Sequence, residues 1–234
     1  MKNIKLTDIL FYLAFSVVII ITTFFDRKYL AYALPITMFF IGGIYMCNIK
    51  KFNVWYLLSL VSMIFCDVLI YTDFISNFSS ICILTSLYFI FCTIALRKYL
   101  FIKTVQRSTF LSIPILISSA LVAYLIFSIS QLLIDMVREV VPEVVFCLVS
   151  STVYILVAYL IYMQDTYRGG LKLIIVSCLC IFIISLLPIN ELFYFNRIFT
   201  VLINIAHVLS LYIFMKFLLE TTPEKTIDSN ERYL

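Results

Sequence analysis

The chain is poor in charged residues, glycine and proline, and it holds a single histidine and a single tryptophan. Asp, Glu, Lys and Arg make up 13% of its 234 residues and hydrophobic residues 64%, with four Gly and five Pro. Such low charge, with a mean hydropathy of +1.11, excludes a soluble domain of this length. The absence of alternating polar and apolar strands argues against a transmembrane β-barrel. We therefore predict an all-α, polytopic integral membrane protein.

Several chemical signatures are also missing. The seven cysteines lie mostly within apolar runs and show no CxxC or Cys/His spacing suited to zinc, so we interpret them as small packing residues. No Gly-x-Ser-x-Gly, His-Glu-x-x-His or phosphate-loop motif occurs. The net charge of +4 is dispersed over loops. We expect no metal, no cofactor and no nucleic-acid partner.

Long apolar runs fill most of the sequence. About 20 apolar residues cross the roughly 30 Å hydrocarbon core of a bilayer, and the chain divides into eight such runs. A polar segment, 221–234, follows them, so we predict a transmembrane domain over 1–220 and a cytoplasmic tail. The run at 171–187 is expected to end at Pro188, because proline interrupts helical hydrogen bonding. The expected helices cover 8–25, 29–47, 54–71, 78–96, 109–134, 144–163, 171–187 and 198–219.

Loop charges support the count of eight. Of the 17 Lys and Arg residues, only Arg27, Lys28, Arg138 and Arg197 fall on one side of the membrane, and the others fall on the opposite side. This asymmetry predicts that both termini are cytoplasmic. No cleavage site follows the basic amino end, so we expect the first helix to be retained, in a bacterial inner membrane. Polar residues near the outer ends of the third and seventh runs are compatible with two four-helix halves.

One acid, Asp67, lies inside an apolar span, the run Val54–Tyr71. Because an ionisable group is costly in hydrocarbon, it usually faces the protein interior or a wet cavity. We predict that Asp67 lines a cavity; the alternative is an interfacial acid that snorkels or is hydrogen-bonded to Tyr71, one turn further on. His207 is a candidate base, or else a packing histidine with two partners. Asp73 and Glu191, in outer turns, are expected to be solvated.

Short motifs in several spans form a further pattern. Leu34-Pro35 stands in the second span, Cys66-Asp67 in the third, Phe74 in the following turn, Thr85-Ser-Leu-Tyr88 in the fourth, Ile184-Ser185-Leu186 in the seventh and Ala206-His207 in the eighth. This pattern resembles the lysoplasmalogenase (YhhN-type) family of eight-span membrane proteins. Pro35, Asp67, Tyr88 and Ser185 match that family's motifs, whereas Leu34, Thr85 and Leu186 replace a lysine, a histidine and a second acid.

The resemblance implies a lipid hydrolase whose partner is a membrane lipid. Such an enzyme cleaves the vinyl ether of a lysoplasmalogen to a fatty aldehyde and a glycerophospho-alcohol, for which one group donates a proton and another activates water. Asp67 is then the expected acid. Because Leu186 replaces the second acid, the other group has to be Asp73, Glu191 or His207. The predicted catalytic residues are Asp67 and His207, and the predicted ligand-contacting residues are Tyr71, Tyr88 and Ser185.

Two other functions fit the sequence. A catalytically degenerate family member would bind a lipid or apolar ligand in the same cavity, or act as a membrane sensor or partner subunit; the loss of polar groups at Leu34, Thr85 and Leu186 favours it. A small transporter would show paired intramembrane charges or broken helices. The sequence shows neither, so the transporter ranks last. The sequence leaves the oligomeric state open.

Overall fold

A computed structural model describes residues 6–49, 52–100, 140–164, 167 and 169–221, together with the single residues 124, 128 and 131. Over these residues the chain is helical and has no strand. Seven helices are long and apolar enough to cross a membrane, so the chain is a multi-pass helical protein. The predicted span 109–134 and the predicted tail 221–234 lie outside the described residues, apart from residues 124, 128, 131 and Thr221.

The seven helices begin and end close to the boundaries predicted from the apolar runs. A helix of 19 residues is about 28 Å long, which matches the hydrocarbon core. The helices are α1 (Leu6–Phe24), α2 (Leu30–Asn48), α3 (Val54–Thr72), α4 (Phe78–Leu96), α7 (Val141–Met163), α8 (Gly170–Pro188) and α9 (Arg197–Glu220). Short helical turns η1 (Arg27–Tyr29) and η2 (Arg97–Tyr99) and the π-helix η5 (Ile189–Phe193) flank them.

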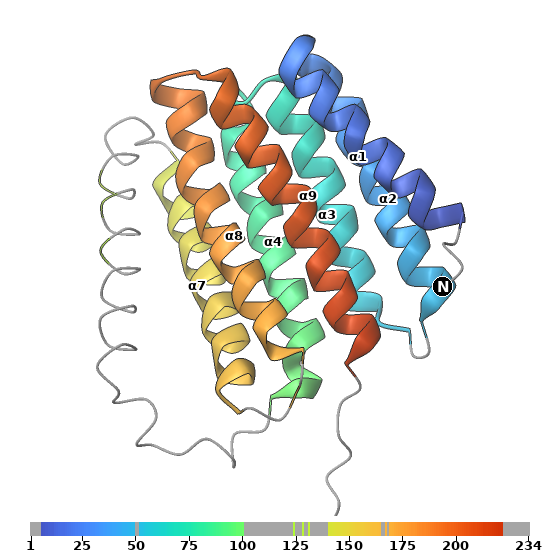
Figure 1. The fold of residues 1–234 in the computed structure, drawn as a ribbon. Coiled ribbons are helices and arrows are strands. Elements are labelled where there is room, and N and C mark those ends of the chain that lie inside the picture. Colours follow the sequence, from blue (N-terminus) through green and yellow to red (C-terminus); the bar gives the residue numbers. More distant parts are fainter. Residues whose placement is uncertain are drawn as a thin grey trace, which may run out of the picture.

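The helices form a bundle with two distinct ends (Figure 1). At one end, which we call the Phe74 end, the α3–α4 turn lies with the ends of α1 and α8 and the start of α9; Arg197 there donates to the Thr23 carbonyl at 3.0 Å. At the opposite Tyr99 end, the Tyr99 hydroxyl donates to the Thr221 carbonyl at 3.1 Å. The Lys172 side chain there pairs with Glu220. The first and last described residues of the bundle lie at the Tyr99 end.

α4 and α7 run parallel to each other. At the Phe74 end the Ser79 hydroxyl donates to Glu143 Oε1 at 3.1 Å, so the two helices start side by side. In mid-bundle the Phe89 and Tyr154 ring centroids lie 5.4 Å apart. The chain therefore leaves α4 at the Tyr99 end and enters α7 at the Phe74 end.

Polar caps and a proline explain several helix ends. Asn53 Oδ1 accepts a hydrogen bond from the Trp55 amide at 3.2 Å at the start of α3, and Asn196 Oδ1 accepts one from the Ile198 amide at 2.9 Å at the start of α9. These bonds satisfy amides that have no partner within the helix. The α-helix ends at Pro188, as predicted, but the helical path continues past this proline. α8 includes it, and η5 follows, closed by the Tyr194 amide on the Ile189 carbonyl at 3.0 Å.

The bundle interior is apolar and aromatic toward the Tyr99 end. Phe214 of α9 is fully buried, and its ring lies 5.9 Å from that of Tyr56 and 6.1 Å from that of Tyr154. Outward faces carry large apolar side chains, as on α1, where Leu13 and Phe24 are exposed. Apolar groups face outward because lipid is the surrounding solvent, and the polar groups gather inside and at the ends.

Candidate functional site

A buried acid–imidazole pair joins α3 and α9 within the bundle. His207 Nε2 lies 3.2 Å from Asp67 Oδ2, and both residues are at most 5% exposed. The alternative in which Asp67 is hydrogen-bonded to Tyr71 does not occur, because Tyr71 has another partner. A carboxyl group and an imidazole in contact can share one proton, so one member can donate a proton while the other accepts.

A second polar pair lies one helical turn closer to the Phe74 end. The Tyr71 hydroxyl, four residues after Asp67, donates to Asn204 Oδ1 at 2.9 Å, and both residues are buried. Asn204 lies three residues before His207, so both pairs share the same contact between α3 and α9. Asn204 Nδ2 donates to the Thr200 carbonyl at 2.8 Å, which fixes which way the amide points.

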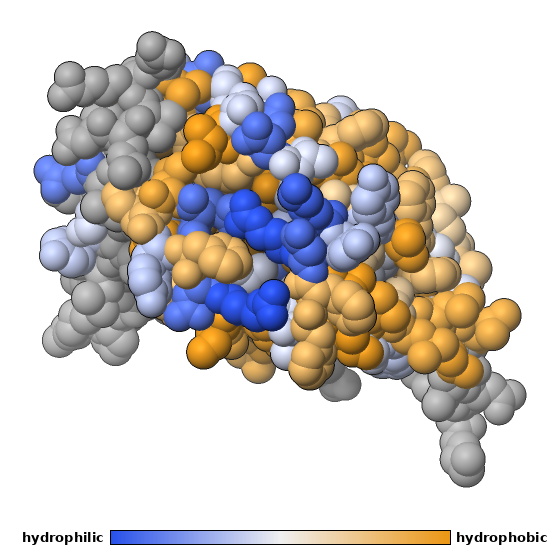
Figure 2. Space-filling view, turned by 90° about the horizontal axis from the view of Figure 1, so that it is seen from above, coloured by the Kyte–Doolittle hydropathy of each residue, from blue (hydrophilic) through white to orange (hydrophobic). Residues whose placement is uncertain are grey.

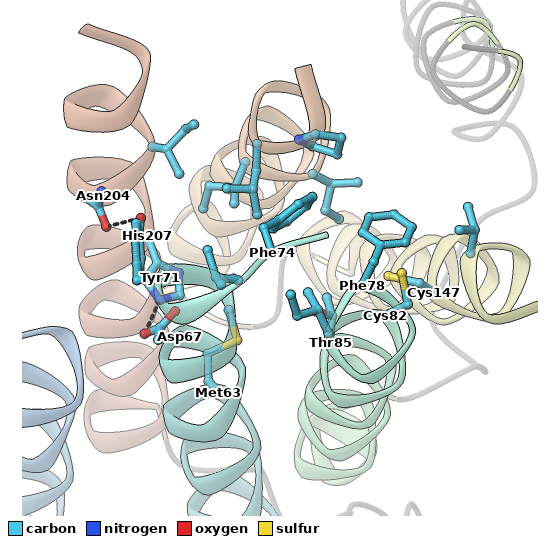
Figure 3. A pocket seen from close by; sticks show the side chains of 18 of the residues that line it. Met63, Asp67, Tyr71, Phe74, Phe78, Cys82, Thr85, Cys147, Asn204 and His207 are labelled. Carbon is cyan, nitrogen blue, oxygen red and sulfur yellow. Dashed lines mark hydrogen bonds and ion pairs between the residues drawn. The ribbon is translucent and has the colours of Figure 1, made fainter. Parts of the chain in front are cut away.

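Beside the two pairs lies a cavity of about 100 Å³, bounded by α3, α4, α7, α8 and α9. Asp67, Tyr71, Asn204 and His207 stand on the α3–α9 wall, and the other walls are mostly apolar, with Thr85 of α4 as a further polar group (Figure 3). A water molecule occupies about 30 Å³ of liquid, so the cavity holds a small reacting group or a few methylenes rather than a whole lipid. Its lining is Met63, Asp67, Ile70, Tyr71, Phe74, Phe78, Ile81, Cys82, Thr85, Val144, Cys147, Leu148, Ile183, Ile184, Leu187, Pro188, Ile203, Asn204 and His207.

A polar recess of about 620 Å³, which we call the vestibule, opens at the Phe74 end. Figure 2 views this end and shows hydrophilic residues gathered at its centre. Arg27 Nη1 lies 2.6 Å from Glu191 Oε2, and the Glu191 side chain is only 2% exposed. The prediction that Glu191 is solvated is therefore wrong, because η5 turns the carboxylate inward onto Arg27. The vestibule is lined by Thr22, Phe24, Phe25, Asp26, Arg27, Asn190, Glu191, Phe195, Arg197 and Thr200.

The structure places the predicted site residues in different environments. Asp67, His207 and Tyr71 line the cavity. Tyr88 is buried against Phe89, with ring centroids 5.1 Å apart, and is not part of the described lining. Ser185 is also outside the described lining, and its hydroxyl donates to the carbonyl of Ile181, one turn back in α8, at 2.7 Å.

The three candidates for the second catalytic group, Asp73, Glu191 and His207, lie in different parts of the structure. Only His207 reaches Asp67, since Glu191 lies in the vestibule. Asp73 is exposed and accepts hydrogen bonds from the Ser76 hydroxyl and amide at 2.7 and 3.2 Å, which lower its pKa and make it a poor proton donor. The structure thus brings the two predicted catalytic residues, Asp67 and His207, into contact.

Of the positions that depart from the lysoplasmalogenase pattern, one lies at the cavity. Thr85 is in the lining, and its Oγ1 lies 3.4 Å from Cys66 Sγ. Leu34 is fully buried and Leu186 is half-buried, and neither belongs to the described lining. An acid at position 186 would therefore not face this cavity without a rotation of α8.

Sequence reasoning missed Asn204 and the vestibule. A signal was present, because Thr200, Asn204 and His207 recur at helical spacing on one face of an otherwise apolar span. The pairing of Arg27 with Glu191 had no comparable signal, since the two residues are far apart in sequence.

The described residues contain no group of three or more His, Cys, Asp or Glu side chains arranged to hold a metal ion. Comparison of the chain with protein-family models, curated proteins and solved structures gave no match. The site is therefore interpreted from its own chemistry.

Proposed function

We propose that the protein is a membrane hydrolase that cleaves the vinyl ether bond of a lysoplasmalogen-type lipid. The observation that carries the proposal is the contact of His207 Nε2 with Asp67 Oδ2 beside an apolar cavity. The reaction needs a proton donor, a base for water and an apolar place for the alkenyl chain. The pair supplies the first two, and the cavity supplies an apolar place for the vinyl ether and the first methylenes of the chain.

In the proposed reaction the protonated member of the pair gives its proton to the vinyl carbon that is not bonded to oxygen. The adjacent carbon becomes an oxocarbenium centre, which water attacks as the pair takes up a proton from that water. The resulting hemiacetal separates into a fatty aldehyde and a glycerophospho-alcohol. One water is consumed for each bond broken, and the pair recovers its proton. The Tyr71 hydroxyl, held by Asn204, lies on the same wall and can orient the water or the ether oxygen.

The assay is aldehyde release from a vinyl-ether lysolipid by the purified protein in bilayers. Asp67→Asn and His207→Gln are each expected to lower the rate by about 100-fold or more, the range of general acid–base catalysis. Asp73→Asn is the matched control, because Asp73 is an exposed carboxylate outside the cavity, and its rate should equal that of wild type. An unchanged rate in Asp67→Asn would exclude the catalytic role.

A second candidate is a non-catalytic protein that binds a lipid or apolar ligand, or acts as a sensor or partner subunit. The largely apolar lining favours it, as does the position of Leu186 outside that lining. Under this proposal the pair fixes the contact between α3 and α9, and a vinyl-ether lipid binds but is not turned over. Turnover by wild-type protein that Asp67→Asn abolishes would rule this candidate out.

The proposed topology has eight spans with both termini in the cytoplasm of a bacterium. The parallel course of α4 and α7 supports the eighth span, because the chain between Leu100 and Val140 has to pass from the Tyr99 end to the Phe74 end. In the eight-span topology, 13 of the 17 Lys and Arg residues fall on the side of the Tyr99 end, so the positive-inside rule favours that end as the cytoplasmic one. The vestibule then faces the outside.

A further inference from the structure

The buried face of α9 changes character at His207. Toward the Phe74 end this face carries Thr200, Asn204 and His207, all at most 5% exposed. Toward the Tyr99 end, Ser210 is the one buried polar side chain of α9, bonded to the His207 carbonyl, and the face continues with the buried Leu211 and Phe214. Polar side chains in the interior of a membrane protein are expensive, and they usually mark a path for water, ions or protons.

The polar half of this face is joined by hydrogen bonds to the vestibule. Asn190 Nδ2 donates to both Glu191 Oε1 and Thr200 Oγ1, each at 3.2 Å. Asn204 Nδ2 donates to the Thr200 carbonyl at 2.8 Å, and the Tyr71 hydroxyl donates to Asn204 Oδ1 at 2.9 Å. Thr200 lines the vestibule and Asn204 lines the cavity, so one turn of α9 separates the two spaces.

The other approaches to the pair are lined mainly by aromatic and apolar side chains. On the Tyr99 side of His207, three rings lie in contact across the bundle. The Phe214 centroid is 5.9 Å from that of Tyr56 and 6.1 Å from that of Tyr154. Across the cavity from the pair lie Phe78 and, as the one hydroxyl in that part of the described lining, Thr85 of α4 (Figure 3). Apolar cavities stay dry, and a buried water needs two to four polar partners. On the vestibule side of the pair, Tyr71, Asn204 and Thr200 supply such partners.

We propose that the file Thr200–Asn204–Tyr71 conducts water from the vestibule to the Asp67–His207 pair. Water then reaches the pair from the Phe74 end, where the vestibule is the nearest polar space. Under the proposed function this file delivers the one water that each hydrolysis consumes. The conduit itself rests on the hydrogen bonds and the two spaces, so it also holds for a protein that binds a ligand without turnover.

The test uses the single histidine, whose ring signals are unambiguous in a uniformly labelled sample. In the full chain in lipid bilayers, the rate of magnetisation transfer from mobile water to the His207 ring is measured by solid-state NMR. Thr200→Val removes one hydroxyl at constant shape, and Thr200→Val combined with Asn204→Leu interrupts two positions of the file. Ser210→Ala is the matched control, because Ser210 is buried on the other side of His207 and donates to its carbonyl at 2.8 Å.

Transfer to His207 should be several-fold slower in Thr200→Val, slower still in the double variant, and unchanged in Ser210→Ala. Equal transfer in wild type and Thr200→Val would overturn the conduit, as would an equal slowing in Ser210→Ala. If the double variant does not fold, Thr200→Val decides the matter alone. The readout does not involve aldehyde release, so a failed hydrolase assay leaves this test intact, and a failed transfer test leaves the catalytic pair intact.

Discussion

At the scale of single residues, the Tyr71–Asn204 hydrogen bond should have a measurable energetic coupling. Both side chains are buried, so either one alone would leave its partner unsatisfied. Tyr71→Phe and Asn204→Leu are each expected to destabilise the protein by about 1–2 kcal/mol, and the double variant by less than their sum. Thermal unfolding in one detergent measures all four proteins. Strict additivity would show that the two side chains do not interact.

Two other tyrosines should behave in the opposite way. The hydroxyls of Tyr56 and Tyr154 are buried and have no hydrogen-bond partner among the described residues. Removing an unsatisfied hydroxyl relieves its desolvation penalty while the ring keeps its packing. Tyr154→Phe is therefore expected to leave the midpoint of thermal unfolding unchanged or to raise it. A clear drop would mean that the hydroxyl has a partner, such as an ordered water.

The individual residues also show how far the sequence alone could lead. The interior position of Asp67 was predictable because an acid inside an apolar span usually faces the protein interior or a wet cavity. His207 was one of three candidate partners, and the sequence could not choose among them because it does not show which face of one helix meets which face of another. That choice depends on the packing of α3 against α9, which brings His207 rather than Glu191 to Asp67. Tyr88 and Ser185 were expected to contact the ligand because they match the family motifs. They lie on faces of their helices that are outside the described cavity lining.

At the scale of helices, the boundaries were predictable where apolar runs end in polar caps. α3 was expected over 54–71 and spans Val54–Thr72, and Asn53 explains its start. The course of the chain past Pro188 was not predictable. Proline removes one amide donor, but the chain stays helical after it and forms η5. η5 contains the buried Asn190.

The glycines of α2 and of the turn before α8 should differ in their tolerance of a methyl group. A Cβ at Gly43 would meet nothing within 4 Å, whereas one at Gly169 would lie 2.8 Å from Thr221 Oγ1 and 3.3 Å from Phe217 Cδ2. Gly43→Ala is expected to stabilise the protein by about 0.5–1 kcal/mol, because alanine loses less backbone entropy in a helix. Gly169→Ala should lower the unfolding temperature through overpacking. A higher unfolding temperature for Gly169→Ala than for Gly43→Ala would contradict the helix packing.

At the scale of the whole molecule, the parallel course of α4 and α7 predicts an eighth crossing. Reporter domains that are active on only one side of the membrane, fused after Leu100 and after Val140, should report opposite sides. A fusion after Leu234 should match the one after Leu100, since both lie at the proposed cytoplasmic end. Fusions after Leu100 and Val140 that report the same side would contradict the eight-span topology.

The account as a whole depends on contact between Asp67 and His207 inside the bundle. The most direct measurement is the nitrogen NMR spectrum of the one histidine in bilayers, recorded for wild type, Asp67→Leu and Asp73→Asn. We predict that Nε2 of wild type shows a hydrogen bond that Asp67→Leu removes and Asp73→Asn leaves unchanged. A His207 spectrum that is the same in wild type and Asp67→Leu would contradict the pair, and with it the proposed site.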